Sequence, residues 1–179
     1  MGFRLSLLTF ALALGCASVT AQAPARESGS QTPAPAVTRL PAVPVIDLDR
    51  RATSLPVLTR GRPALVALWA TWCKSCAEEL GELDRLQARV GDRALVVAVA
   101  VGEPYETVRE FLRPRGLRYA QLVDEEFALA DALGSERVPT TLVVDREGAV
   151  RYTGGALDRG ALEALRAVME QPASLASAP

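Results

Sequence analysis

Two unbroken apolar runs, residues 64–70 and 94–101, are the strongest hydrophobic pattern in the chain. Runs of this length without a polar interruption are typical of parallel strands that helices cover on both faces. In the stretch between them, leucines and a valine recur every three or four residues, which predicts a helix over residues 73–90 with one apolar face. Strand, helix and strand together predict a β-α-β unit at the centre of the fold.

Further helices and strands are predicted on the C-terminal side of this unit. Pro104 is placed for the first turn of a helix that Pro114 ends. A short strand over residues 119–123 follows, and Asp124 is placed to cap a helix over residues 125–133. We expect this helix to turn one apolar face inward: Phe127, Ala130 and Leu133.

A hairpin and a last helix complete the predicted domain. Strands over residues 141–144 and 150–153 are separated by a turn in which Gly148 can take a positive φ. Asp158 is placed to cap a helix that ends at residue 170. Two short strands are expected before the central unit: one over residues 43–48 at an edge of the sheet, and one near Ser54 and Leu55.

The N-terminus predicts an export signal. Arg4 precedes an apolar stretch over residues 5–14, which is shorter than the about 20 residues needed to cross a bilayer. Ordinary cleavage after an Ala-Gln-Ala sequence would make residues 1–23 the signal peptide. The sequence Leu-Ala-Leu-Gly-Cys16 also resembles a bacterial lipobox, in which case residues 1–15 are removed and Cys16 carries lipid. Both alternatives predict an exported, periplasmic protein, and the second predicts one that a lipid anchors to the membrane.

Composition separates the rest of the chain into three parts. Residues 24–39 are rich in Ala, Pro, Ser and Thr without apolar periodicity, which predicts a disordered tether. Residues 40–170 form the predicted domain, and residues 171–179 a frayed tail. The formal net charge of −1 gives no basic excess, so we expect no nucleic-acid partner.

Cys73 and Cys76 stand two residues apart where the first buried strand turns into the helix. The free N–H groups and the partial positive charge of a helix N-terminus favour thiolate over thiol. Zinc usually needs four Cys or His ligands, whereas this chain has no histidine and only one other cysteine, Cys16. An inert structural disulfide would stabilise little, because so short a loop loses little entropy when it closes. We therefore interpret the pair as a redox-active dithiol that needs no metal or organic cofactor, with Cys73 the more exposed sulfur.

Trp72-Cys-x-x-Cys76 after an apolar strand, together with Val138-Pro139-Thr140, resembles the thioredoxin superfamily, and the segments 99–103 and 139–142 resemble its exported TlpA/ResA-type thiol-disulfide oxidoreductases. The resemblance covers about residues 40–170 and implies an α/β thioredoxin-like fold. Such a fold has a central mixed sheet flanked by helices, here with a short N-terminal strand extension. It also implies a cis bond before Pro139, beside the dithiol, so that the Val138 backbone can pair with an extended substrate segment.

The surroundings of the dithiol match the TlpA/ResA-type pattern in part. Glu79, three residues after Cys76, matches a glutamate that these relatives keep near their dithiol, and it can lie one helical turn from that sulfur. Ala67 stands where thioredoxin has a buried aspartate, and Gly81 where many relatives have a proline that kinks the helix. We expect Trp72 to contact substrates and Lys74 to support the Cys73 thiolate weakly from an exposed position.

The function that the resemblance implies is exchange of thiols and disulfides with other exported proteins. Cys73 attacks a partner disulfide and Cys76 resolves the mixed disulfide. We expect a reductant, re-reduced by a membrane or exported dithiol protein, and relatives of this type often act in cytochrome c maturation. The alternatives are a disulfide-introducing oxidant and a dithiol protein that binds Cu(I), which histidine and a methionine-rich segment would have favoured. No second motif supports a peroxidase.

Overall fold

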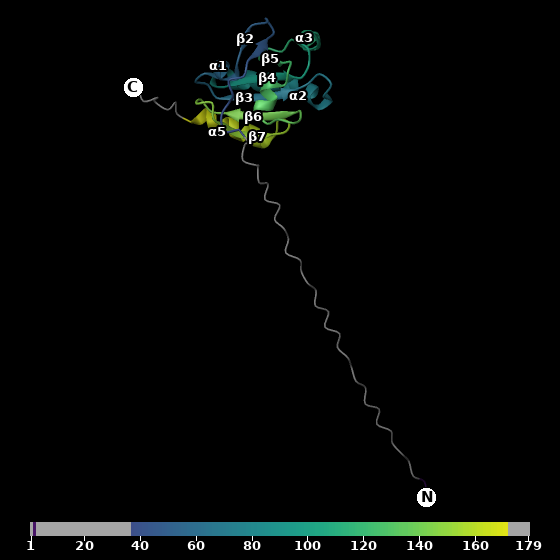
Figure 1. Cartoon of the computed structure of the whole chain (residues 1–179). Coiled ribbons are helices and arrows are strands. Elements are labelled where there is room, and N and C mark those ends of the chain that lie inside the picture. The colour runs from purple at the N-terminus through teal and green to yellow at the C-terminus, as the bar shows by residue number, and fades with distance from the viewer. Residues whose placement is uncertain (1, 3–36, 172–179) are drawn as a thin grey trace. The chain divides into compact units, whose positions relative to one another are not determined.

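The computed structural model describes residues 2 and 37–171, in which seven strands form one mixed sheet between two layers of helices (Figure 1). The predicted signal peptide apart from residue 2, with Cys16, residues 24–36 of the predicted tether and residues 172–179 of the predicted tail lie outside the described residues. None of the helices within the described part is both long and apolar enough to cross a membrane.

The sheet has the order β2-β1-β5-β4-β3-β6-β7. Its centre is parallel, since β4 pairs in parallel with both β3 and β5, and the outer pairings on each side are antiparallel. The strands are β1 (Val45–Asp47), β2 (Ala52–Thr53), β3 (Ala64–Trp69), β4 (Leu95–Val101), β5 (Ala120–Asp124), β6 (Thr140–Val144) and β7 (Val150–Gly154). This is the central mixed sheet that the sequence predicted.

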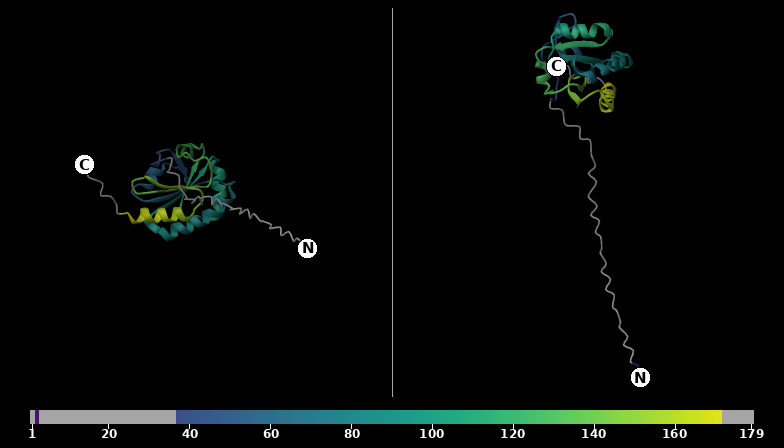
Figure 2. Two further views of the ribbon diagram at one scale, coloured as in Figure 1. Left: turned by 90° about the horizontal axis from the view of Figure 1, so that it is seen from below. Right: turned by 90° about the vertical axis from the view of Figure 1, so that its right-hand side faces the viewer.

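Helices cover both faces of this sheet (Figure 2). The helices are α1 (Leu55–Thr59), α2 (Lys74–Val90), α3 (Tyr105–Leu112), α4 (Ala128–Ala132) and α5 (Arg159–Glu170), with short 3₁₀ turns at Gly91–Arg93 and Arg113–Arg115. Buried side chains of α2, α3 and α5 belong to one core cluster, and those of α1 and α4 to the other. Strand β3 is buried along its whole length, and its alternate side chains enter the two clusters, as expected of a strand with helices on both faces.

The N-terminal part of the sheet differs from the prediction in two ways. Strand β1 is not an edge strand, because β2 pairs with its outer side and becomes the edge. The segment after β2 is a helix, α1, although Pro56 and its short length gave no helical signal. Its buried Leu55 packs among residues of β3 and β4 in the second cluster, so tertiary contacts rather than local propensity stabilise it.

Helix α4 also begins later than predicted. The helix starts at Ala128 and its N-cap residue is Phe127, not Asp124 as predicted. The Asp124 carboxylate still accepts hydrogen bonds from the N–H groups of Leu129 and Ala130 in the first turn. Phe127 precedes the helix with φ of +58° and is 47% exposed, so the prediction that it faces inward is wrong. Asp158 caps α5 as predicted, with a bond from the Ala161 N–H.

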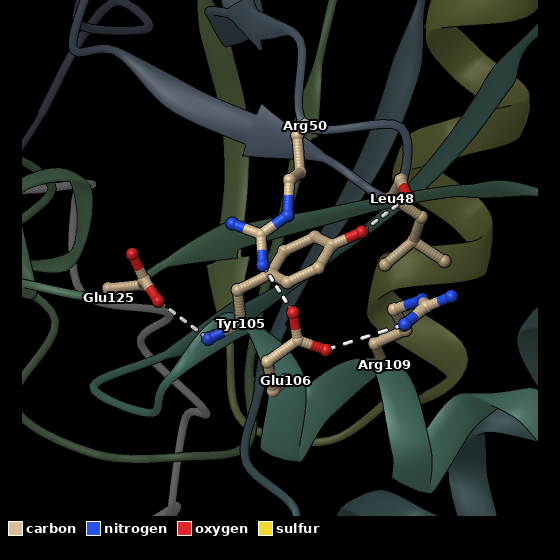
Figure 3. A network of polar contacts seen from close by, with 6 residues as sticks. All are labelled: Leu48, Arg50, Tyr105, Glu106, Arg109 and Glu125. Atoms are coloured by element: carbon tan, nitrogen blue, oxygen red, sulfur yellow. Dashed lines mark hydrogen bonds and ion pairs between the residues drawn. The ribbon is translucent and has the colours of Figure 1, made fainter.

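A network of polar contacts fastens the turn between β1 and β2 and the loop after β5 to the first turn of α3 (Figure 3). The Tyr105 hydroxyl donates to the Leu48 carbonyl at 2.5 Å, and its backbone N–H donates to the Glu125 carboxylate at 2.6 Å. The Arg50 guanidinium lies 4.2 Å from the centre of the Tyr105 ring and pairs with Glu106. The loop that carries Phe127 is therefore tied to α3 through Glu125.

The described chain begins against the turn between β6 and β7. The Thr38 carbonyl accepts a hydrogen bond from the Val150 N–H, and the Leu40 N–H donates to the Gly148 carbonyl. Gly148 has φ of +79°, as predicted for this turn. Residues 38 and 39, which the sequence analysis placed in the tether, thus contact the domain.

Candidate active site

The two cysteines lie at the carboxyl edge of the parallel strands, where the loops after β3, β4 and β5 meet. Cys73 follows β3 as the N-cap of α2, and Cys76 lies in the first helical turn. Their sulfur atoms form a disulfide, with an S–S distance of 2.07 Å and a Cα–Cα distance of 5.3 Å. Cys73 is 7% exposed and Cys76 is 1% exposed, so Cys73 is the more accessible sulfur although both are buried.

Polar groups of the helix N-terminus surround the Cys73 sulfur. The Cys76 N–H donates a hydrogen bond to it at 3.3 Å, and the Ser75 hydroxyl lies 3.5 Å from it. A negative charge on this sulfur is stabilised by such donors and by the positive end of the helix dipole. The geometry therefore favours Cys73 as the thiolate of the reduced pair.

The loop before β6 carries the predicted cis bond, between Val138 and Pro139. Val138 is partly buried and packs against the core cluster that contains both cysteines. Val138 lies outside the helices and strands, and its backbone N–H and C=O form no hydrogen bond with other backbone groups of the described chain. These two groups are free to pair with an added strand.

Two other predicted site residues lie on the surface at this edge. Trp72 is 70% exposed, whereas Trp69 in β3 is 2% exposed and belongs to the core. Lys74 is exposed at the first position of α2, where water screens its charge.

Glu79 is buried in α2, with 8% of its surface exposed. One carboxylate oxygen accepts a hydrogen bond from the Leu157 N–H at 2.8 Å, and the other is buried without a partner among the described residues. Burial raises the pKa of Glu79 above its ordinary value, and the Leu157 hydrogen bond opposes this rise. Ala67 in β3 brings no second carboxylate to this part of the core.

Glu103 is a buried carboxylate at the same edge that the sequence analysis did not identify as a site residue. It lies just after β4, is 8% exposed, and accepts hydrogen bonds from the Thr71 N–H, at 2.6 Å, and from the Thr71 hydroxyl. Thr71 is two residues before Cys73, so Glu103 holds the loop that leads to the dithiol. In the sequence Glu103 ends the segment 99–103 that resembles the TlpA/ResA-type proteins, and it follows an apolar strand after one glycine, but neither observation gave it a role at the site.

A groove of about 380 Å³ opens beside Trp72. Trp72 and Val138 line it, as predicted for substrate contacts, but so does Phe127, which the sequence analysis placed in the core. The remaining lining residues are Val101, Glu126, Ala130, Asp131, Ser135, Glu136 and Arg137.

Comparisons with known proteins agree with this geometry. A family model described as AhpC/TSA family matches residues 31–153. The thiol-disulfide oxidoreductase ResA of Geobacillus thermodenitrificans is 31% identical over 93 residues, which are 51% of this chain and 53% of that protein. The thiol:disulfide interchange protein DsbE of Escherichia coli is 36% identical over 97 residues, 54% of this chain and 51% of that protein. The chain thus spans about half the length of these relatives.

Solved structures show the same fold at lower sequence identity. A putative thiol:disulfide interchange protein DsbE from Chlorobium tepidum superposes with a TM-score of 0.67 at 20% identity, covering 74% of this chain and 96% of that one. The dsbF protein of Mycobacterium tuberculosis gives a TM-score of 0.63 at 23% identity, covering 71% and 95%. The thioredoxin-like architecture predicted from the sequence is confirmed.

Proposed function

The chain belongs to the AhpC/TSA family, and on that premise we propose that it is a thiol-disulfide oxidoreductase that reduces disulfides of other exported proteins. The disulfide between Cys73 and Cys76 at the start of α2 is the observation that carries this proposal. The names of the relatives, ResA and DsbE, support the same class of reaction.

The reaction uses the two sulfur atoms in sequence. The Cys73 thiolate attacks one sulfur of the partner disulfide, whose S–S bond breaks as the mixed disulfide forms. The Cys76 thiolate then attacks the Cys73 sulfur, and the partner leaves with both of its sulfurs reduced. Two electrons pass to the partner, and the chain is left as the Cys73–Cys76 disulfide. A membrane or exported dithiol protein returns it to the reduced state.

The partner segment binds in an extended conformation along Val138. The unpaired backbone groups of Val138, next to the cis bond, support this strand addition. Among possible partners, apocytochrome c before haem attachment is the one that the TlpA/ResA resemblance implies. Reduction of an oxidised Cys-x-x-Cys-His peptide, compared with the same peptide lacking histidine, measures that preference, and equal rates would remove it.

The direction of transfer follows from the charges near the sulfurs. Glu79 is buried one turn from Cys76 and disfavours a second negative charge there, whereas Lys74 is exposed and stabilises the thiolate weakly. We expect a reduction potential closer to the about −270 mV of thioredoxin than to the about −120 mV of the strongest periplasmic oxidants. Equilibration with glutathione buffers, read by alkylation of free thiols, measures it. A value near −120 mV would instead favour the disulfide-introducing oxidant, and tight Cu(I) binding without exchange would favour the copper protein.

Glu79→Gln tests the origin of this potential. The amide keeps an acceptor for the Leu157 N–H but removes the charge, so we expect a lower apparent pKa of the dithiol. A thiolate of lower pKa is a weaker nucleophile and makes the pair a weaker reductant, so disulfide reduction should be slower at neutral pH. Because the pKa of Glu79 is raised in the folded protein, its carboxyl group still carries a proton at pH values just above 4.5, at which the same group in the unfolded chain is ionised. The free energy of unfolding therefore falls as pH rises through this window, and Glu79→Gln should flatten that dependence. Exposed Glu78, changed to Gln, is the matched control; identical titrations of all three proteins would contradict this account.

We also propose that the chain is exported and that residues 38–170 are its working domain, behind a tether over residues 24–37. Mass spectrometry of the mature protein from a bacterial membrane is expected to find either a lipidated Cys16 or a free N-terminus at Pro24. Loss of membrane association in Cys16→Ala selects the first, and soluble material that begins at Pro24 selects the second. An unprocessed Met1 would contradict export by either route.

A further inference from the structure

Phe127 has an unusual backbone conformation for an aromatic residue. Its φ of +58° lies in the left-handed region, which glycine adopts without cost and which a bulky side chain adopts only when its surroundings hold it there. Backbone conformations of this kind cluster at ligand-binding and active sites. The ring is nevertheless 47% exposed, so burial in the core does not explain the conformation.

The Phe127 ring is seated on Gly102. A Cβ atom at Gly102 would lie 1.8 Å from the ring, and Gly102 itself has φ of +69°, so only glycine fits beneath the phenylalanine. The ring is therefore held at a fixed position on the rim of the loop after β4.

Three hydrogen bonds hold the loop that carries the ring. The Gly102 N–H donates to the Asp124 carbonyl at 2.8 Å, and the Asp131 N–H donates to the Phe127 carbonyl at 2.8 Å. Glu125 accepts from the Tyr105 N–H (Figure 3). An exposed ring held this firmly is preorganised to contact another molecule.

The groove beside the ring combines apolar walls with an acidic rim. Trp72, Phe127 and Val138 line it together with Val101 and Ala130. The charged residues that line it are one base, Arg137, and three acids, Glu126, Asp131 and Glu136. None of these four side chains forms an ion pair within the described chain. Unpaired carboxylates around an apolar groove are complementary to a cationic segment that carries a large apolar side chain.

We propose that this groove selects partner disulfides whose cysteine lies next to a large apolar side chain with a lysine or arginine beside it. Phe127 and Trp72 are the two aromatic walls that receive the apolar side chain, and Glu126, Asp131 and Glu136 receive the cation. This specificity rests on the proposed reductase function, because the groove adjoins Val138 and the residue before Cys73. A second copy of this chain is the rival occupant.

Four synthetic peptides test the proposal by binding to the oxidised full-length protein. They share one extended sequence in which serine replaces the cysteine. They differ only at the two variable positions beside that serine, which carry Phe-Lys, Phe-Glu, Gly-Lys or Gly-Glu. In an NMR titration we expect the Phe-Lys peptide to bind about tenfold more tightly than Gly-Lys. We expect it to bind severalfold more tightly than Phe-Glu at low salt, with that second difference shrinking at high salt. Signals of Trp72, Phe127 and Val138 should shift, and those of Leu162 should not.

Matched variants separate the groove from the rest of the surface. Phe127→Gly suits the positive φ, so the fold should persist, and it should remove most of the Phe-over-Gly preference. Glu126→Gln combined with Glu136→Gln should remove most of the Lys-over-Glu preference. Leu162→Ala changes an exposed apolar side chain on α5, and Glu163→Gln changes an exposed acid on the same helix. Each of these control variants should keep the Phe-over-Gly and the Lys-over-Glu preference.

The outcomes distinguish this inference from the function on which it rests. Equal affinities of wild type for all four peptides, or a preference that survives Phe127→Gly, would overturn the groove assignment even if the protein reduces disulfides. The same four peptides with cysteine restored, each held in a disulfide with glutathione, then report the reaction: no reduction of any of these disulfides by the dithiol would overturn the proposed function. Concentration-dependent self-association that shifts the Trp72 and Phe127 signals without peptide would assign the groove to a second copy instead.

Discussion

Cys73→Ser is expected to lower the rate of disulfide reduction by about a thousandfold or more, because it removes the more accessible nucleophile of the dithiol. We expect that Cys76 cannot replace it, since the Cys76 residue is 1% exposed against 7% for Cys73. Cys76→Ser is expected to fail differently: the attack by Cys73 still occurs, but no second thiolate resolves the product. Non-reducing gel electrophoresis should show mixed disulfides with substrate in Cys76→Ser alone.

The third cysteine supplies the control for this pair. Cys16→Ser makes the same chemical change outside the thioredoxin-like domain, and it should keep full activity in solution. Iodoacetamide labelling of the reduced protein should modify Cys73 faster than Cys76. Equal labelling of both thiols, together with activity retained in Cys73→Ser, would contradict the assignment of the nucleophile.

Glu103→Ala is expected to lower the free energy of unfolding by about 1–3 kcal/mol, the cost of leaving a buried polar group without its partner. Here the groups left without a partner are the Thr71 backbone N–H and hydroxyl, which both donate to the Glu103 carboxylate. The loss should also slow disulfide exchange, because Thr71 positions the loop before Cys73. Urea unfolding of the oxidised protein and single-turnover rates measure the two effects.

Two further variants show whether the effect comes from the buried contact. Glu103→Gln keeps an oxygen acceptor and should recover part of both losses. Glu106→Ala removes a neighbouring carboxylate whose ion pair with Arg50 is more than half exposed, so its cost should stay below about 1 kcal/mol. If Glu103→Ala unfolds at the same urea concentration as Glu106→Ala, the Thr71 contact does not stabilise this loop.

Local patterns in the sequence were enough to predict the central unit and the dithiol. Strands β3 and β4 are unbroken apolar runs because both of their faces are covered, and α2 shows its buried face in the spacing of its leucines. Cys73 and Cys76 lie at the junction of β3 and α2, so the residues next to them in the sequence were enough to predict their position at the start of the helix. The cis bond at Pro139 came from the resemblance to a known family, since nothing in the spacing of residues distinguishes it.

Only the tertiary structure decided which distant residues meet at the dithiol edge. Thr71 and Glu103 are 32 residues apart, and the parallel pairing of β3 with β4 brings them together. Helix α1 forms because Leu55 finds a place in the core, not because its five residues favour a helix. Phe127 fits a helical period, yet α4 starts only after it, where the Asp124 carboxylate binds N–H groups of the first turn, and the ring lies over Gly102. Periodicity reports which face of an element is apolar, whereas caps and pairings between distant segments decide where that element begins and what lies beside it.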